Sequence, residues 1–335
     1  MTTFGATILD ADELRLRSDE KALFRDVDPF GFILFARNID TPDQVRALCG
    51  DLREAVGRDC LITIDQEGGR VQRLRGPHWR EWLPPLEQVQ GAGERAAEAM
   101  YLRYRIIAHE LREIGIDSNC APLVDVAGPD THPFLQNRCY GFEAEAVASI
   151  GRAVADAHLD GGVLPVVKHI PGHGRAVVDS HLDLPVVDAD PEDLSDTDFA
   201  PFRDLNDLPM GMTAHLVYSR LGNGPATTSS KVMQIVRDDI GFDGLIMTDD
   251  ISMKALSGSL PEIAKSSLAA GCDVVLHCNG TFAERVATAE ASGKMNDAGL
   301  ARAERALEAR KTPDEVDIPA LEAKLSAIMS GQDDV

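Results

Sequence analysis

Three histidines and a lysine are concentrated between residues 168 and 181, directly after a run of apolar residues. Histidine changes its charge near neutral pH, so it suits proton transfer or metal binding. Asp179 and His181 stand two residues apart on a segment that proline and glycine predict to be a loop. At this spacing the carboxylate can accept a hydrogen bond from imidazole Nδ1, which makes the ring a better proton donor. The pair is therefore a candidate acid/base catalyst, although a surface ion pair has the same spacing.

The same stretch also holds a candidate zinc site, because His169, His173 and His181 are ligands of a type that zinc accepts. However, Pro171 and Gly172 separate the first two histidines and prevent the helical spacing that lets two such side chains chelate one ion. No cysteine lies nearby. We therefore expect no bound metal and no cofactor.

Acidic residues follow two other apolar runs. Asp249 and Asp250 come after residues 244–248, and Asp65 comes after residues 61–64, with Glu67 and two glycines close behind. Each acid is compatible with a solvated turn or a helix cap as well as with catalysis. The two glycines would let the backbone approach a ligand closely. His215 and His277 lie inside apolar runs and are expected to be packed histidines rather than ligands.

These groups are positioned by an expected alternation of strands and helices. The strands read as near-continuous apolar runs, which is typical of parallel sheets covered on both faces. Alternation of this kind predicts an α/β fold, and the length suits a (β/α)8 barrel of the TIM type, whose strand-end groups share one face. Residues 6–9 are expected either as the eighth strand or as an antiparallel flap. A doubly wound open sheet is the alternative, but no glycine-rich phosphate loop follows the first strand. The seven expected strands cover residues 30–36, 61–64, 119–126, 163–167, 210–218, 244–248 and 272–277.

Composition limits the partners of the chain. The 335 residues are expected to form one domain, closed by amphipathic helices in residues 281–335. A formal net charge of −22 argues against binding to nucleic acid or to an anionic membrane. The six scattered cysteines, the acidic N-terminal segment and the lack of a long apolar run predict a cytoplasmic protein with reduced, buried thiols. We also expect a monomer.

Four motifs together resemble glycoside hydrolase family 3, and in particular its single-domain bacterial β-N-acetylhexosaminidases of the NagZ type. The resemblance extends from about residue 5 to about residue 280. The motifs are residues 65–73 (DQEGGRVQR), 168–174 (KHIPGHG), 179–181 (DSH) and 248–253 (TDDISM).

The resemblance implies a retaining exo-β-N-acetylglucosaminidase that acts on a small carbohydrate. It assigns Asp249 as the nucleophile and His181, paired with Asp179, as the general acid/base, with Asp250 in a supporting role. The natural substrate that it implies is a GlcNAc-1,6-anhydro-N-acetylmuramyl peptide from cell-wall turnover. The residues that it assigns to the non-reducing sugar are Asp65, Arg73, Arg138, Lys168 and His169.

Three other interpretations of the residues stay open at this point. Asp249 and Asp250 could serve a substrate-assisted hexosaminidase, in which no covalent bond to the protein forms. The three histidines could serve a metal-dependent hydrolase. A barrel that binds sugar without cleaving it is the third, and the intact Asp179–His181 pair disfavours it.

Overall fold

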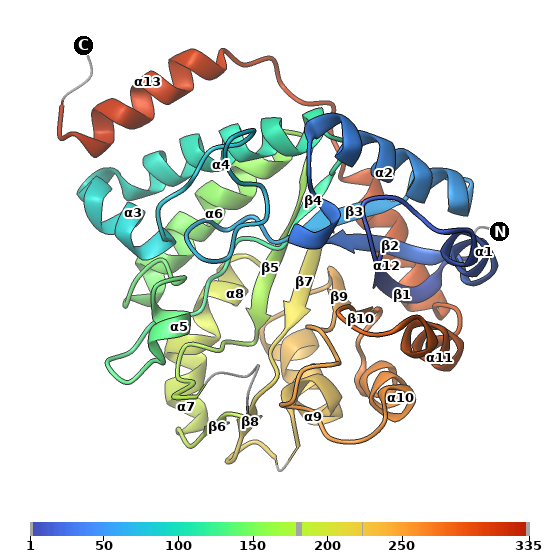
Figure 1. Ribbon diagram of the computed structural model, residues 1–335. Coiled ribbons are helices and arrows are strands. Elements are labelled where there is room, and N and C mark those ends of the chain that lie inside the picture. Colours follow the sequence, from blue (N-terminus) through green and yellow to red (C-terminus); the bar gives the residue numbers. More distant parts are fainter. Residues whose placement is uncertain (1–2, 179–182, 223, 333–335) are drawn as a thin grey trace.

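A computed structural model describes residues 3–178, 183–222 and 224–332. A ring of strands stands at the centre of the molecule, and helices surround it (Figure 1). The strands of this ring are β1 (Gly5–Asp10), β2 (Pro29–Leu34), β3 (Leu61–Ile64), β4 (Ser118–Asn119), β5 (Leu164–Ile170), β7 (Met210–Thr213), β9 (Leu245–Met247) and β10 (Val275–His277).

The strands form two parallel four-stranded sheets, in the orders β10-β1-β2-β3 and β4-β5-β7-β9. Backbone hydrogen bonds join the sheets at both edges. Cys120 N–H donates to Ile64 O (2.8 Å) beside β3 and β4, and Thr248 N–H donates to Val274 O (3.0 Å) beside β9 and β10. These bonds connect the eight strands in one cycle, the arrangement that a barrel of the TIM type requires. The α/β class predicted from the sequence is confirmed.

Strand β1 lies parallel between β10 and β2, so residues 6–9 belong to the sheet and the antiparallel flap is wrong for them. The strand expected over residues 119–126 is irregular: regular pairing ends at Asn119, and only scattered bonds to β5 continue, such as that from Val124 N–H to Lys168 O (2.9 Å). One reason is that Pro122 has no N–H to contribute to a ladder.

The strand predicted over residues 210–218 is shorter than expected. Residues 210–218 do not form one strand, because β7 ends at Thr213. The chain then leaves the barrel, and β8 (Val217–Tyr218) pairs with β6 (Val186–Val187) in a separate two-stranded sheet.

The helices cover the outside of the strands (Figure 1). Their limits follow local signals: the Thr41 side chain accepts from Gln44 N–H at the start of α2, and Gly57 ends that helix in a left-handed conformation. The longer helices are α1 (Ser18–Val27), α2 (Pro42–Val56), α3 (Pro85–Ala92), α4 (Ala96–Glu113), α6 (Ala144–Asp160), α10 (Leu260–Ala270), α11 (Phe282–Ser292), α12 (Asp297–Glu308) and α13 (Ile318–Met329). The short ones are α5 (Pro133–Gln136), α7 (Pro191–Asp193), α8 (Ala200–Asp204) and α9 (Ser230–Gln234).

Neighbouring residues of a strand face different parts of the core. Leu61 and Val166 belong to a cluster inside the ring, whereas Ile62 and Val167 pack against the helices. Both faces are therefore buried, which is why the strands read as continuous apolar runs rather than as alternating ones.

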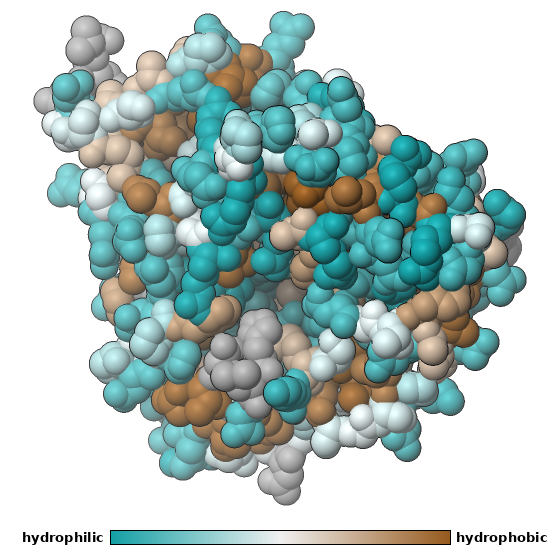
Figure 2. All heavy atoms as spheres, in the orientation of Figure 1, coloured by the Kyte–Doolittle hydropathy of each residue, from teal (hydrophilic) through white to brown (hydrophobic). Residues whose placement is uncertain are grey.

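The outer surface in Figure 2 is mostly polar, as expected for a chain in which 26% of the residues are charged. Apolar residues on this face lie in small separate areas. None of the helices in the described ranges is long and apolar enough to cross a membrane. All six cysteines are buried and free, as expected from the sequence.

Candidate active site

A pocket of about 370 Å³ opens at the carboxyl ends of the barrel strands. Barrel enzymes place their active sites on this face, because the loops that follow the strands converge there. The structure brings together in this pocket most of the site residues predicted from the sequence. They come from the carboxyl ends of β3, β5 and β9, the segments that follow them, and the loop before α6, and they are Asp65, Arg73, Arg138, Lys168, His169 and Asp249.

Asp249 follows β9 and is half-buried at the pocket wall. Its Oδ1 accepts the backbone N–H of Asp250 at 2.8 Å. Burial alone would raise the pKa of the Asp249 carboxyl, but His215, His169, the Asp250 N–H and Lys168 outweigh this effect, and the pKa falls below its ordinary value. Asp249 is therefore ionised at neutral pH, as a carboxylate nucleophile must be.

Asp250 has a different environment from its neighbour. Its Oδ1 accepts the N–H of Ser252 (3.0 Å) and of Cys278 (3.3 Å), and its Oδ2 accepts the Ser252 hydroxyl (2.7 Å) and the Asn279 amide (3.4 Å). Both oxygens of Asp250 are thus engaged by the protein. This arrangement favours Asp249 for attack and a supporting role for Asp250.

A network of buried ion pairs forms the floor of the pocket. Lys168 Nζ lies 2.9 Å from Asp65 Oδ1 and 2.6 Å from Glu67 Oε1. Arg73 contacts the other oxygen of Asp65 at 3.0 Å. Arg138 grips Glu67 with two parallel hydrogen bonds of 2.9 and 2.8 Å. The five side chains hold one another in fixed positions and present charged hydrogen-bonding groups to a polar ligand.

Glu67 is the member of this network to which sequence reasoning gave no role. Burial raises the pKa of its carboxyl, but Arg138 and Lys168 outweigh burial and lower the pKa to about 2. Glu67 therefore stays charged and balances the two cations that flank it. The only signal in the sequence was its place two residues after Asp65, at the end of a strand.

Gly68 is required for a reason other than the expected one. The residue has a φ of +109°, and a Cβ there would lie 1.8 Å from Nη2 of Arg103. Arg103 is fully buried and donates to the carbonyl of Glu67, as does the Tyr104 hydroxyl at 3.1 Å. The glycine therefore makes room for a buried arginine behind the pocket, and no close approach to a ligand is needed to explain it.

His169 is held by Asp125, a residue that sequence reasoning placed in a strand without a function. Asp125 Oδ2 lies 2.7 Å from His169 Nδ1, and its Oδ1 accepts the backbone N–H of His169 (3.2 Å) and of His173 (2.7 Å). One carboxylate thus binds both ends of the turn after β5. Because Nδ1 is engaged, Nε2 is the ring nitrogen of His169 that remains for a ligand in the pocket.

The predicted acid/base residues, Asp179 and His181, lie outside the described residues. Val178, the last described residue before them, lines the pocket. The zinc hypothesis also depends on His181. Within the described ranges no group of three His, Cys, Asp or Glu side chains is arranged to hold a metal ion. Burial and the neighbouring His169 lower the pKa of His173 to about 4, so its ring is neutral at pH 7.

His215 is buried, as predicted, and it also contacts the backbone next to Asp249. Its Nε2 contacts the carbonyl of Asp250 at 3.1 Å, and its Nδ1 contacts the Thr227 hydroxyl at 2.7 Å. The ring therefore helps to hold the backbone that carries Asp249. His277 is also fully buried, with Nδ1 3.9 Å from Asp250 Oδ1.

Two phenylalanines that the sequence did not single out stand at the rim of the pocket. The guanidinium of Arg70 stacks over the ring of Phe134, 3.3 Å from its centre. Phe35 lies under the guanidinium groups of Arg37 (4.8 Å) and Arg73 (5.2 Å). The rim therefore combines aromatic faces with positive charge, although the whole chain is strongly acidic.

Fold and pocket together define a parallel α/β protein of the TIM-barrel class, with an ionised carboxylate and a cluster of fixed charges at the carboxyl ends of its strands. Residues 7–308 match the N-terminal domain of glycosyl hydrolase family 3. The chain belongs to this family, which confirms the resemblance found in the sequence motifs.

Individual relatives agree with this assignment. The chain is 35% identical over 290 residues to the β-hexosaminidase of Thiobacillus denitrificans, covering 83% of this chain and 79% of that protein. Native NagZ from Neisseria gonorrhoeae superposes with a TM-score of 0.82 at 30% identity, over 98% of this chain and 96% of that one. The complex of that NagZ with N-trifluoroacetyl-D-glucosamine matches equally well, with a TM-score of 0.82, 30% identity and coverage of 98% and 97%.

Proposed function

We propose that this family 3 glycoside hydrolase is a retaining exo-β-N-acetylglucosaminidase, which removes terminal β-linked N-acetylglucosamine from its substrates. The observation that carries the proposal is the ionised carboxylate of Asp249, held at the wall of a small pocket next to Lys168 and His169. The names of the relatives support the choice of sugar, since they include β-hexosaminidases and a NagZ that binds a glucosamine derivative.

In the proposed reaction, Oδ2 of Asp249 attacks the anomeric carbon and a covalent glycosyl-enzyme forms. The imidazolium of His181 protonates the departing sugar oxygen as the glycosidic bond breaks. Neutral His181 then takes a proton from water, which attacks the anomeric carbon and releases Asp249. Asp179 holds and polarises the His181 ring through both steps.

The charged floor of the pocket has a separate task in this scheme. Asp65, Lys168 and Arg138 would bind the hydroxyl groups of the non-reducing sugar. Because these groups already hold one another, they lose little freedom when a sugar binds, and the anomeric carbon is placed against Asp249 at low entropic cost.

We also propose a muropeptide as the natural substrate, with N-acetylglucosamine linked to 1,6-anhydro-N-acetylmuramyl peptide, so that the enzyme would act in peptidoglycan recycling in the cytoplasm. The sequence motifs resemble enzymes that act on such a substrate, and Arg70, stacked on Phe134 at the pocket edge, lies where it can contact the part of the substrate beyond the terminal sugar.

Two experiments test the proposal. A panel of 4-nitrophenyl β-glycosides (GlcNAc, GalNAc, Glc and Xyl), assayed with and without a chelator, should show a preference for GlcNAc that the chelator does not change. A fluorosugar that traps the glycosyl-enzyme, followed by peptide mass spectrometry, should label Asp249. Label on Asp250, or turnover without any label, would contradict the covalent mechanism, and the second result would support the substrate-assisted alternative.

A further inference from the structure

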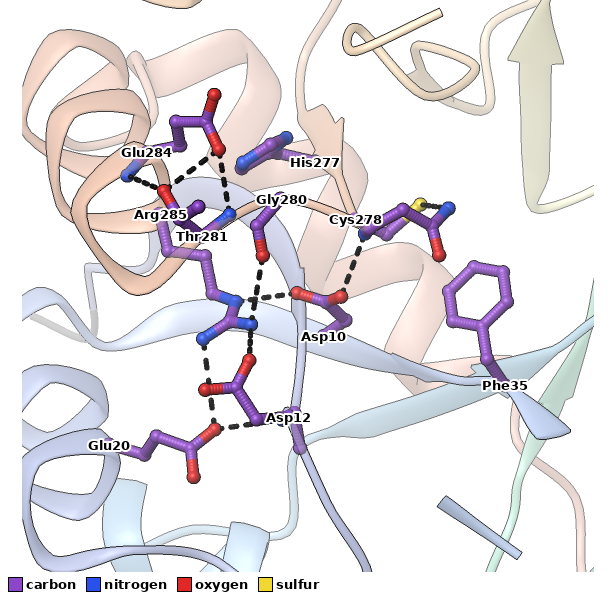
Figure 3. Close-up of polar contacts among 12 residues, drawn as sticks. Asp10, Asp12, Glu20, Phe35, His277, Cys278, Gly280, Thr281, Glu284 and Arg285 are labelled. Atoms are coloured by element: carbon purple, nitrogen blue, oxygen red, sulfur yellow. Dashed lines mark hydrogen bonds and ion pairs between the residues drawn. The ribbon is translucent and has the colours of Figure 1, made fainter. Parts of the chain in front are cut away.

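The last residue of β1, Asp10, is fully buried beside the pocket and has no place in the mechanism described above. It stands where β1 meets β10, and α11 begins just beyond the end of β10. Figure 3 shows Asp10 between the Arg285 side chain on one side and the backbone near Cys278 on the other. A buried carboxylate is costly unless it is paired, so its partners indicate its purpose.

Arg285, from α11, anchors Asp10 on the outer side. Its Nε donates to Asp10 Oδ1 at 2.7 Å, and the same guanidinium contacts Asp12 and lies 3.8 Å from Glu20 (Figure 3). The Arg285 side chain is only 1% exposed. Because several carboxylates surround this one cation, Asp10 cannot move without breaking a buried ion cluster.

Asn279 is held by Asp10 on the pocket side. Asp10 Oδ2 accepts the Asn279 backbone N–H at 2.8 Å, and Arg37, which also contacts Asp10, donates to Asn279 Oδ1 at 2.8 Å. Asn279 has a φ of 62°, a left-handed conformation that is uncommon outside glycine. Such a conformation persists where the surroundings impose it, and it is concentrated at functional sites.

The orientation of Asn279 matters because this residue lines the pocket and contacts Asp250, the neighbour of the proposed nucleophile. With N–H and Oδ1 fixed, its Nδ2 is directed at Asp250 Oδ2, 3.4 Å away. The neighbouring Cys278 N–H donates to the other oxygen of Asp250. Asp250 in turn donates its own N–H to Asp249 Oδ1.

We infer that Asp10 is a positioning residue for Asp249, acting through Asn279 and Asp250; the inference rests on the proposed nucleophilic role of Asp249. Asp10 fixes the turn after β10, and this turn holds the Asp250 carboxylate. The backbone N–H of Asp250 then donates a hydrogen bond to Oδ1 of Asp249. Oδ2 of Asp249 is then the oxygen left to face the anomeric carbon.

This arrangement predicts which kinetic constant depends on Asp10. The residues proposed to bind the sugar lie after β3, on β5 and in the loop before α6, whereas Asp10 acts on the β9 and β10 side. Loss of Asp10 should therefore displace the nucleophile and leave sugar binding intact. A displacement of about 1 Å from reacting geometry slows a reaction about 100-fold.

The test compares the rate at which a trapping fluorosugar labels Asp249 in the intact protein and in three variants. Asp10→Asn removes the charge and keeps the size. Asn279→Gly keeps the left-handed backbone without strain and removes only the amide, so it should fold even if Asp10→Asn does not. Asp273→Asn is the matched control, because Asp273 is a buried acid at the opposite end of β10 that pairs with Arg237 at 2.7 Å and lies away from the pocket.

The maximal labelling rate of Asp10→Asn should fall about 100-fold, and that of Asn279→Gly about tenfold, with the half-saturating fluorosugar concentration unchanged. Asp273→Asn should lower the melting temperature and leave the maximal rate unchanged. Unchanged maximal rates in Asn279→Gly and in folded Asp10→Asn would overturn the inference while Asp249 remains the nucleophile. Wild-type protein that carries no label on Asp249 would instead overturn the proposed function, and the inference with it.

Discussion

Lys168 and Glu67 form a buried ion pair at the floor of the pocket, with Nζ 2.6 Å from Oε1. Their side chains are only 2% and 1% exposed. Breaking one side of such a pair leaves an uncompensated charge in a poorly solvated site. The pair therefore links the stability of the barrel to the geometry of the pocket, and substitution of the glutamate alone can test this link.

The first prediction is that Glu67→Gln weakens both stability and sugar binding. The amide has the size of the carboxylate, but it no longer balances Lys168 and Arg138. We expect the free energy of unfolding to fall by about 3–5 kcal/mol. KM for a 4-nitrophenyl N-acetylglucosaminide should rise about tenfold, with a smaller change in kcat, because the two cations would be displaced from the sugar. Denaturant titration and steady-state kinetics measure these quantities.

Glu110→Gln is the control for that substitution. Glu110 is a mostly buried acid that pairs with Arg80 on the outside of the barrel, away from the pocket. This variant should lose some stability and keep its KM. If both variants lost stability and neither changed KM, Glu67 would have a purely structural role.

The second prediction concerns stability in acid. The ordinary pKa of a glutamate is 4.5, and that of Glu67 in the folded protein is about 2. Because the folded state holds its proton less tightly than the unfolded state, the stability from Glu67 is fully present above pH 4.5 and is lost as the pH falls toward 2. The melting temperature of the wild type should fall more steeply across this interval than that of Glu67→Gln. Parallel curves for the two proteins would contradict the low pKa.

The third prediction concerns the proposed acid/base pair. His181→Ala and Asp179→Ala should each lower kcat/KM about 100-fold or more for substrates whose leaving group needs a proton. The loss should be much smaller for aryl glycosides with good leaving groups, which depart without full protonation. Circular dichroism should show an unchanged fold. Equal losses for good and poor leaving groups would refute the acid role of His181.

The fourth prediction concerns the thiols near the pocket. Burial, and to a smaller extent neighbouring acids, raises the pKa of Cys120 to about 12 and that of Cys278 well above its ordinary value. A thiol reacts as the thiolate, so neither side chain should react readily at neutral pH. Treatment of the folded protein with iodoacetamide should leave its activity unchanged. Rapid inactivation with alkylation of Cys278 would show that this thiol is more acidic and more accessible than its environment indicates.

Much of the fold could be predicted from the sequence, because its signals are local. Strands buried on both faces leave apolar runs, and glycine, proline and capping residues mark where elements end. All five residues predicted to bind the sugar line one pocket together with Asp249, because the carboxyl ends of parallel strands share one face of a barrel. Motif resemblance supplied their proposed roles.

The pairing of buried charges was decided only by the tertiary structure. Asp125 lies 44 residues from His169, Glu67 lies 71 from Arg138, and Asp10 lies 269 from Asn279. No periodicity within one element reports contacts at such separations. Any of these acids could have been a solvated turn residue, and each became a fixed part of the site because closing the ring of strands removed it from water and left a specific cation or N–H as its partner.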